Sequence, residues 1–489
     1  MFKYLPLLFI TAIAFTSCGD EFLDRDPIDR IPTDNFYRTA DEMQSATRAI
    51  YTGIQSQDFY GQAWGVDEMP SDDSRPSGED GVDNFAANPN NENVLRYWRG
   101  HYRVITLANT VIEKAPDAEI SEELRQQLVA EARFLRGISY FNLVRIYGGV
   151  PIVEEIPTLE RDLFPARATV EETYDFLKAD LENAVEFLPL ENQQHRATKG
   201  AAMAYLASVY LTLEDYEKAR ELSLAVINSG QYELVDSVGM LWTAPTYDNN
   251  SESIFEIQFA GCESWGTGNM RQAFFAPFNQ GITKGSDGWG VLVPTNPNSN
   301  TAGTTALDVW EDGDRRRYWT LMEPGNHYPT INPNDGGYTY PATGVGGVRA
   351  NIKKYVIGGG ADVCFMSTSQ NGSLMRFSEV IYIYAESTAR LQSNLTQDPI
   401  ALELVNKIRE RSQVAPFAFL TVEDIFAERR REFMFEGKRW FDILRLPETE
   451  ALTLLRQSGV TLTAQRLLLP IPAVELEVND NLEQNPGYN

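Results

Sequence analysis

The chain has 489 residues, of which 43% are hydrophobic and 23% charged, so it can bury a large core without disulfides or structural metals. Its 69 acidic residues outnumber its 42 lysines and arginines, which gives a formal charge of −27. This charge repels phosphate backbones, so nucleic acid is not expected as a partner, and it fits a solvated acidic surface that keeps a protein soluble.

The first seventeen residues predict a secretion signal that ends at a cysteine. Lys3 gives a positive start, residues 5–15 are mostly apolar, and Thr16 and Ser17 stand directly before Cys18. The apolar stretch is too short to span a bilayer. A small residue before a cysteine is what a lipoprotein signal peptidase requires, so we expect removal of residues 1–17 and acylation of Cys18. An ordinary cleaved signal with a chance cysteine is the alternative.

Apolar residues at helical spacing predict a series of helices along the remaining chain. The expected helices cover residues 35–54, 95–114, 122–147, 170–188, 199–228 (a pair), 379–391 with 399–412 (a pair), and 422–446 (a last pair). Asp34 is the expected N-cap of the first helix and Ser121 that of the third. Residues 58–93 are rich in Gly, Pro, Asp and Asn, which predicts an irregular loop outside the core.

Residues 199–228 match the tetratricopeptide template, with Leu206, Ala207 and Tyr210 on one helix and Tyr216 and Ala219 on the next. Isolated helical pairs cannot bury their apolar faces, so pairs at about 34–228 and 379–446 should stack in a right-handed array. The interval 231–372 is loop-rich, with short strand-like runs at 254–259 and 353–357. The predicted fold is therefore mainly α: a tetratricopeptide-like helical-repeat scaffold with long irregular loops and a few short strands.

Four stretches resemble the SusD/RagB-like family, and together they span nearly the whole mature chain. They are FLD and NFY at 22–24 and 35–37, EARFLR with YGGVP at 131–136 and 147–151, ERRREF with EGKRWFD at 428–433 and 436–442, and PIP with QNPGY at 470–472 and 484–488. The acidic run 19–24 also resembles the surface-export signal of Bacteroidetes lipoproteins. Any one of these matches is weak, but four in order after a lipoprotein signal are specific.

The resemblance implies a single SusD-like domain over residues 18–489, anchored by lipid in the outer membrane and exposed at the cell surface. It implies capture of oligosaccharides or polysaccharides, delivery to a SusC-like TonB-dependent transporter, no cofactor and no catalysis. Three alternatives remain open: a peptide-binding member of the family, a surface glycan-degrading enzyme, and a helical scaffold for outer-membrane assembly. A glycosidase needs only two carboxylates, and with 69 acidic residues the sequence alone does not exclude that activity.

The charged run near the C-terminus predicts a structural network. Opposite charges recur three residues apart, which places them side by side on a helix. The expected pairs are Glu428 with Arg431, Glu436 with Arg439, Arg439 with Asp442, and Asp442 with Arg445. Aromatic residues are interleaved with these charges, so we expect the run to lock this helix against its neighbours.

Motifs of metal or nucleophilic catalysis are absent from the sequence. His101, His195 and His327 lie far apart, and there is no P-loop or nucleophile elbow, so no metal site is predicted. Asp312 and Asp314 have oxygen ligands for calcium, but a capped turn is the favoured interpretation.

Flat aromatic side chains in the loops are the candidate ligand-binding residues, because a pyranose stacks its apolar C–H face on such rings. The predicted contacts are Trp64, Trp265, Trp289, Trp319 and Tyr338. Other loop aromatics are Trp310, Tyr328 and Tyr340. In contrast, Trp98, Trp242 and Trp440 are expected in the core. Whether Cys262 and Cys364 form a disulfide stays open.

Overall fold

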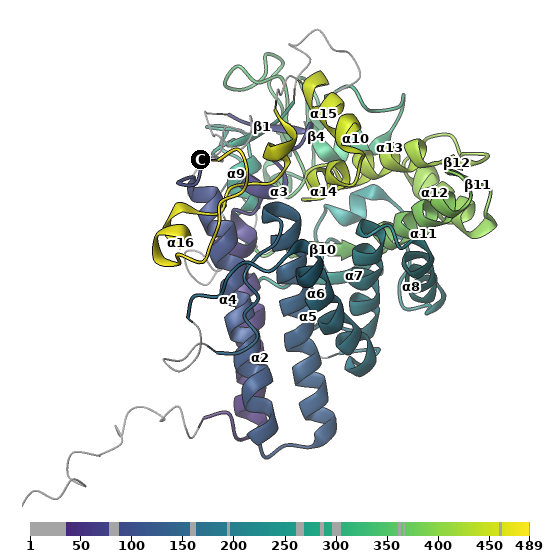
Figure 1. Cartoon of the computed structure of the whole chain (residues 1–489). Coiled ribbons are helices and arrows are strands. Elements are labelled where there is room, and N and C mark those ends of the chain that lie inside the picture. Colours follow the sequence, from purple (N-terminus) through teal and green to yellow (C-terminus); the bar gives the residue numbers. More distant parts are fainter. Residues whose placement is uncertain are drawn as a thin grey trace, which may run out of the picture.

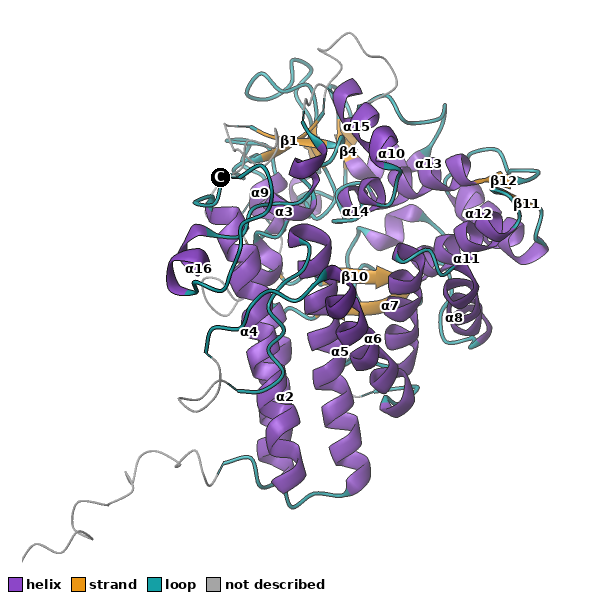
Figure 2. Cartoon of the chain, in the orientation of Figure 1, coloured by secondary structure: helices purple, strands orange, loops and turns teal. Residues whose placement is uncertain are grey.

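The structure is a computed structural model, and the molecule that it shows is mostly helical (Figures 1 and 2). It describes residues 36–77, 88–156, 163–192, 196–260, 268–283, 288–295, 305–359, 363–364, 367–458 and 462–488. None of the helices within these ranges is both long and apolar enough to cross a bilayer.

The longer helices follow the predicted order. In the first half they are α2 (Ala40–Ile54), α4 (Glu92–Lys114), α5 (Glu122–Tyr147), α6 (Val170–Phe187), α7 (Lys199–Thr212) and α8 (Tyr216–Asn228). In the second half they are α11 (Phe377–Leu391), α12 (Pro399–Arg411), α13 (Val422–Phe433), α14 (Arg439–Leu444), α15 (Glu448–Gln457) and α16 (Ala473–Val478). Ser121 caps α5 as expected, whereas α2 begins at Ala40 behind a capping box of Thr39 and Glu42.

Consecutive helices pack against one another as pairs. α2 packs on α4, α4 on α5, α5 on α6, and α7 on α8, and α11 then continues the stack by packing on α8 and α12. Ala207 and Ala219 are fully buried, as expected for small residues where helices approach closely. In Figure 1 the long helices form the lower body of the molecule, β1 and β4 lie at its upper end, β10 lies near the middle, and β11 and β12 lie at the right.

The described strands form six separate antiparallel pairs. The longest is β2 (Ser253–Ile257) with β10 (Gly372–Arg376). The others are β1 (Ser74–Pro76) with β3 (Leu292–Pro294), β4 (Leu321–Met322) with β7 (Asn351–Ile352), β5 (His327–Tyr328) with β6 (Tyr338–Thr339), β8 (Val363–Cys364) with β9 (Ser367–Thr368), and β11 (Leu395–Thr396) with β12 (Leu420–Thr421). The run 254–259 is thus confirmed as a strand. The run 353–357 is not, because the chain turns at Tyr355, whose φ is +66°.

The prediction that residues 58–93 stay outside the core is wrong for their first part. A π-helical turn (Gln57–Gly61), α3 (Trp64–Asp67) and β1 lie in this segment, and most residues from 59 to 74 are buried. Polar composition misled the sequence interpretation, because buried Asp72 and Asp73 are neutralised by distant arginines. Arg439 Nε lies 2.7 Å from Asp72, and Arg430 Nε lies 2.7 Å from Asp73.

The last helical pair, predicted over 422–446, is present as α13 and α14. α13 ends at Phe433 and α14 begins at Arg439, because Phe435 and Gly437 have positive φ angles of +66° and +72°. The backbone N–H of Gly437 donates to the carboxylate of buried Glu68, and a Cβ at this position would lie 2.9 Å from Asp67 Oδ2. The interruption between α13 and α14 therefore makes room for the acidic segment that follows α3.

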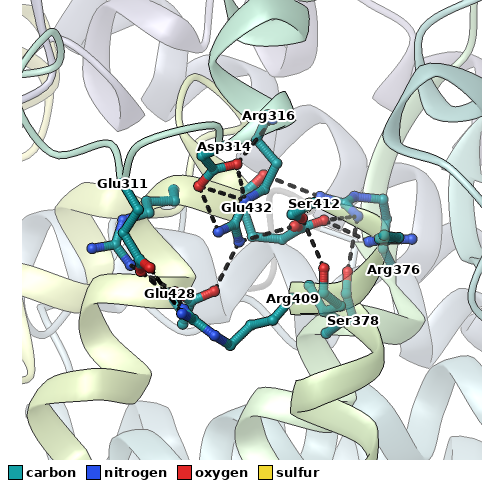
Figure 3. Close-up of polar contacts among 12 residues, drawn as sticks. Glu311, Asp314, Arg316, Arg376, Ser378, Arg409, Ser412, Glu428 and Glu432 are labelled. Carbon is teal, nitrogen blue, oxygen red and sulfur yellow. Dashed lines mark hydrogen bonds and ion pairs between the residues drawn. The ribbon is translucent and has the colours of Figure 1, made fainter. Parts of the chain in front are cut away.

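A buried ionic network joins the loop-rich interval to the helices, and Figure 3 shows its centre. Arg376 lies 2.6 Å from Glu252, 3.0 Å from Glu432 and 2.9 Å from Glu436. Arg316, on the short helix α10 (Arg315–Thr320), lies 2.9 Å from Glu428. The network fixes the loops against α11, α12 and α13.

Arginines keep the buried carboxylates of this network charged. Burial would raise the pKa of Glu432, but Arg411, Arg376 and Arg316 outweigh burial and hold that pKa far below its usual range. The locking role expected for the charged run is confirmed. Of the four expected helical pairs, Glu428 with Arg431 and Asp442 with Arg445 are present at 2.6 and 3.0 Å.

The two other expected pairs are replaced by longer-range partners. Glu436 pairs with Lys354 at 2.7 Å and with Arg376, whereas Arg439 pairs with Asp72. The interruption between α13 and α14 removes Glu436 from any helix, so its three-residue spacing from Arg439 no longer places the two side chains next to each other. Arg439 and Asp442 share α14, but Asp442 pairs with Arg429 and Arg445 instead.

Candidate functional site

Three of the five predicted ligand residues have described side chains, and all three lie partly buried at the loop-rich end. These are Trp289, Trp319 and Tyr338. The side chain of Trp64 and the whole of Trp265 lie outside the described residues. The expected core residues Trp98, Trp242 and Trp440 are confirmed as buried. Two further loop aromatics, Tyr328 and Tyr340, are fully buried, and their rings pack against those of Tyr318 and Tyr338.

Trp289 lies beside an exposed phenylalanine that the sequence interpretation missed. Phe278 bridges Gly288 in a parallel pairing, and 63% of its side chain is exposed to solvent. The ring of Trp289 meets Phe274 edge to face at 5.0 Å, which holds the indole in place. The bridge thus places the backbone of Phe278 next to Gly288, the residue that precedes Trp289 in the chain.

The same turn carries a hydrogen bond to Tyr338. The Tyr338 hydroxyl donates to Gln280 Oε1 at 3.4 Å, and Tyr338 pairs with Tyr328 across β5 and β6. Burial raises the pKa of Tyr338 to about 12, so its hydroxyl stays protonated at neutral pH. Tyr338 therefore presents both a ring and a hydrogen-bonding group.

Tyr318 and Trp319 extend this surface along α10. Tyr318 stacks on Tyr328 at 5.0 Å and donates a hydrogen bond from its hydroxyl to the His327 carbonyl. The ring of Trp319 lies 4.4 Å from the ammonium of Lys353, a buried side chain whose pKa burial lowers to about 7. Trp319 also packs on Gly239, where a Cβ would approach the indole to 2.6 Å.

We call this surface the aromatic row: Phe278, Trp289, Tyr318, Trp319 and Tyr338. It offers flat rings for the apolar faces of sugars and nearby amide and hydroxyl groups for their hydroxyls. Sequence reasoning missed Phe278 and Tyr318. A signal for Phe278 was available, because it stands in a Pro-Phe-Asn-Gln-Gly turn where Asn279 and Gly281 have positive φ.

Two buried groups with shifted pKa values, Glu68 and His101, lie outside this row. Burial raises the pKa of Glu68, which lies inside the molecule and accepts from Gly437, and burial lowers the pKa of His101 to about 3. The enclosed cavity between α5, α7, α11 and α14 has a volume of only about 80 Å³, too small for a sugar. Beside the row, Glu323 is tied to Arg317 at 2.7 Å.

The candidate calcium ligands Asp312 and Asp314 lie in a capped turn, which is the interpretation that the sequence favoured. Asp314 accepts from the backbone N–H of Arg316 at the start of α10, and its carboxylate also lies 2.8 Å from the Arg316 guanidinium. The described residues contain no group of three or more potential metal ligands. Cys18 and Cys262 lie outside the described residues, as does the side chain of Cys364.

Comparisons with known proteins give a consistent result over the chain. A family model described as "Starch-binding associating with outer membrane" matches residues 21–211, and the SusD family model matches residues 251–488. A SusD-like protein of Bacteroides ovatus is 29% identical over 475 residues, covering 90% of this chain and 82% of the relative.

Solved structures match the fold over most of the chain. A structure with xylogluco-oligosaccharide superposes with a TM-score of 0.77 at 25% identity, covering 89% of this chain and 97% of that one. Surface glycan-binding protein A from Bacteroides fluxus gives a TM-score of 0.75 at 25% identity, covering 92% and 100%. The family models, which match both halves, and these full-length similarities lead to one conclusion: the chain belongs to the SusD/RagB family, a family of non-catalytic binding proteins.

Proposed function

We propose that this protein captures oligosaccharides or polysaccharides at the cell surface on the aromatic row. The observation that carries the proposal is the row itself: exposed Phe278 beside Trp289, connected through Gln280 to Tyr338. The relatives support it, since one solved structure contains xylogluco-oligosaccharide and another is named a surface glycan-binding protein. Rings held by packing lose little conformational entropy when a sugar stacks on them.

The test is a glycan array probed with purified residues 19–489, followed by product analysis of each bound polysaccharide. We expect binding to at least one glycan and no shortening of it after prolonged incubation. Binding to peptides alone would favour the peptide-binding alternative. Products of cleavage would overturn the proposed role as a binding protein.

The proposed partner is a SusC-like TonB-dependent transporter. Residues 18–489 would act as one domain, a tetratricopeptide-like stack of α2 to α8 and α11 to α13 that carries the row. The ionic network supports this arrangement, because Glu252, Glu311 and Arg316 from the loop-rich interval pair with side chains of the stack. A rigid connection lets the stack dock on a transporter while the loops hold the sugar.

The proposed anchor is an acylated Cys18 in the outer membrane. Replacing Cys18 with serine should move the protein from the outer-membrane fraction to the aqueous fraction, because acyl chains supply the membrane affinity. Fractionation of cells and labelling with an alkynyl fatty acid measure this. Unchanged fractionation and labelling of the Cys18→Ser variant would contradict the anchor.

A further inference from the structure

A second cavity lies along α13, away from the aromatic row. Its volume is about 620 Å³, within the range of about 300–1,000 Å³ that is typical of small-molecule sites. The walls come from α13, α15, the end of α11 and the segment at residues 308–309. Figure 1 shows α13 and α15 at the upper right of the molecule.

The inner wall of this cavity carries guanidinium groups with unused donors. Arg439 is 94% buried, since its side chain is 6% exposed. Its Nε and Nη2 both donate to Asp72, and its Nη1 has no acceptor among the residues that the structure describes. Arg390 also lines the cavity: its Nη1 donates to Asn394 at 3.3 Å, and its Nε has no hydrogen-bond partner among those residues, although it lies 4.0 Å from Glu386 Oε1. Buried donors of this kind need an acceptor, from water or from a ligand.

Carboxylates stand at the entrance of the cavity. Asp308, Glu423 and Glu450 are exposed and line it. The remaining lining is largely apolar: Val309, Val422, Phe426, Ala427, Leu446, Pro447 and Leu454. The cavity thus combines donors, acceptors and an apolar wall, which is the set of groups that a molecule with hydroxyls and C–H faces uses.

Charge decides between a neutral and an anionic ligand. The cavity's arginines already have carboxylate partners. Arg430 and Arg439 pair with Asp72 and Asp73, Arg431 pairs with Glu311 at 3.1 Å and with the shared Glu428 at 2.6 Å, and Arg390 lies 4.0 Å from Glu386. With three more carboxylates at the entrance, an anion would enter a negative field. We therefore propose that this cavity is a second binding site, specific for a neutral sugar of about disaccharide size.

The experiment is saturation-transfer difference NMR on purified residues 19–489. The probes are maltose, cellobiose, lactose and sucrose at millimolar concentration, with digalacturonate as the anionic counterpart. We expect at least one neutral disaccharide to give a signal that persists in Phe278→Ala/Trp289→Ala, a variant of the aromatic row. This variant separates the second site from the proposed function, because both changes lie in the aromatic row and neither residue lines the second cavity.

Two variants test the cavity itself. Ala427→Trp fills it from α13, and Glu423→Gln/Glu450→Gln changes only exposed side chains, so the double variant keeps the fold. We expect Ala427→Trp to weaken the disaccharide signal about tenfold, because it removes space for the ligand. We expect Glu423→Gln/Glu450→Gln to weaken it about threefold, because it removes carboxylate hydrogen-bond acceptors. Ala225→Trp, at an exposed alanine of α8, is the matched control and should leave the signal unchanged.

Three outcomes would overturn the second site. They are no neutral disaccharide signal with the unmodified protein, a signal that Ala427→Trp and the double variant both leave intact, and a signal lost in the aromatic-row variant. A stronger signal from digalacturonate than from every neutral probe would overturn the proposed specificity.

Discussion

Replacing Glu428 with alanine is expected to lower the free energy of unfolding by about 3–5 kcal/mol, the cost of breaking a buried ion pair from one side. The Glu428 side chain is fully buried between Arg316, Arg409 and Arg431, and Arg316 and Arg431 lie 2.9 and 2.6 Å from its oxygens. Removing the carboxylate leaves these guanidiniums with less negative charge in a medium of low polarity. Urea unfolding followed by circular dichroism measures the change.

The matched control is Glu403→Ala on α12. Glu403 is 65% exposed and pairs with Lys407 at 2.8 Å, so its loss should change stability by less than about 0.5 kcal/mol. If Glu428→Ala were no more destabilising than Glu403→Ala, the network would have no role in fixing the loops to the helices.

The double variant Phe278→Ala/Trp289→Ala is expected to weaken binding to any glycan found on the array by about a hundredfold. Aromatic residues at the centre of a binding surface each contribute about 2 kcal/mol or more when truncated, and the two losses overlap because the rings are neighbours. Phe278 is mostly exposed, so its removal should not affect folding. Isothermal titration calorimetry with the bound glycan measures the loss of affinity.

Phe419→Ala is the control for this variant. Phe419 is 45% exposed and lies next to β12, on a hairpin that contributes nothing to the aromatic row. Its replacement removes a comparable exposed ring and should leave the affinity unchanged. Equal affinities of all three proteins would place the glycan elsewhere on the surface.

The helices were predictable because their signals are local. α5 begins and ends where Ser121 and Gly148 indicate, and the apolar spacing between them needs no knowledge of the rest of the chain. The buried segment after α3 was not predictable in this way. In the sequence Asp72 and Asp73 are typical loop residues, and their burial depends on Arg430 and Arg439, which lie far away along the chain.

The same distinction between local and long-range signals applies to the candidate site. Composition identified the loop-rich interval and three of the aromatics in the row, Trp289, Trp319 and Tyr338. Phe278 escaped notice because exposure depends on the turn that carries it, and Asn279 adopts φ of +56° only in the folded chain. The position of the break between α13 and α14 was hidden for a similar reason, since the charged run has helical spacing on both sides of it.

The pairing of Asp72 with Arg439 has a consequence for biogenesis. These partners are 367 positions apart, and Asp73 and Arg430 are 357 positions apart, so most of the chain must emerge before either pair can close. A chain synthesised from its N-terminus therefore carries this acidic segment uncompensated until Arg430 and Arg439 have been added. Folding of this region is therefore postponed until synthesis of the chain is nearly finished.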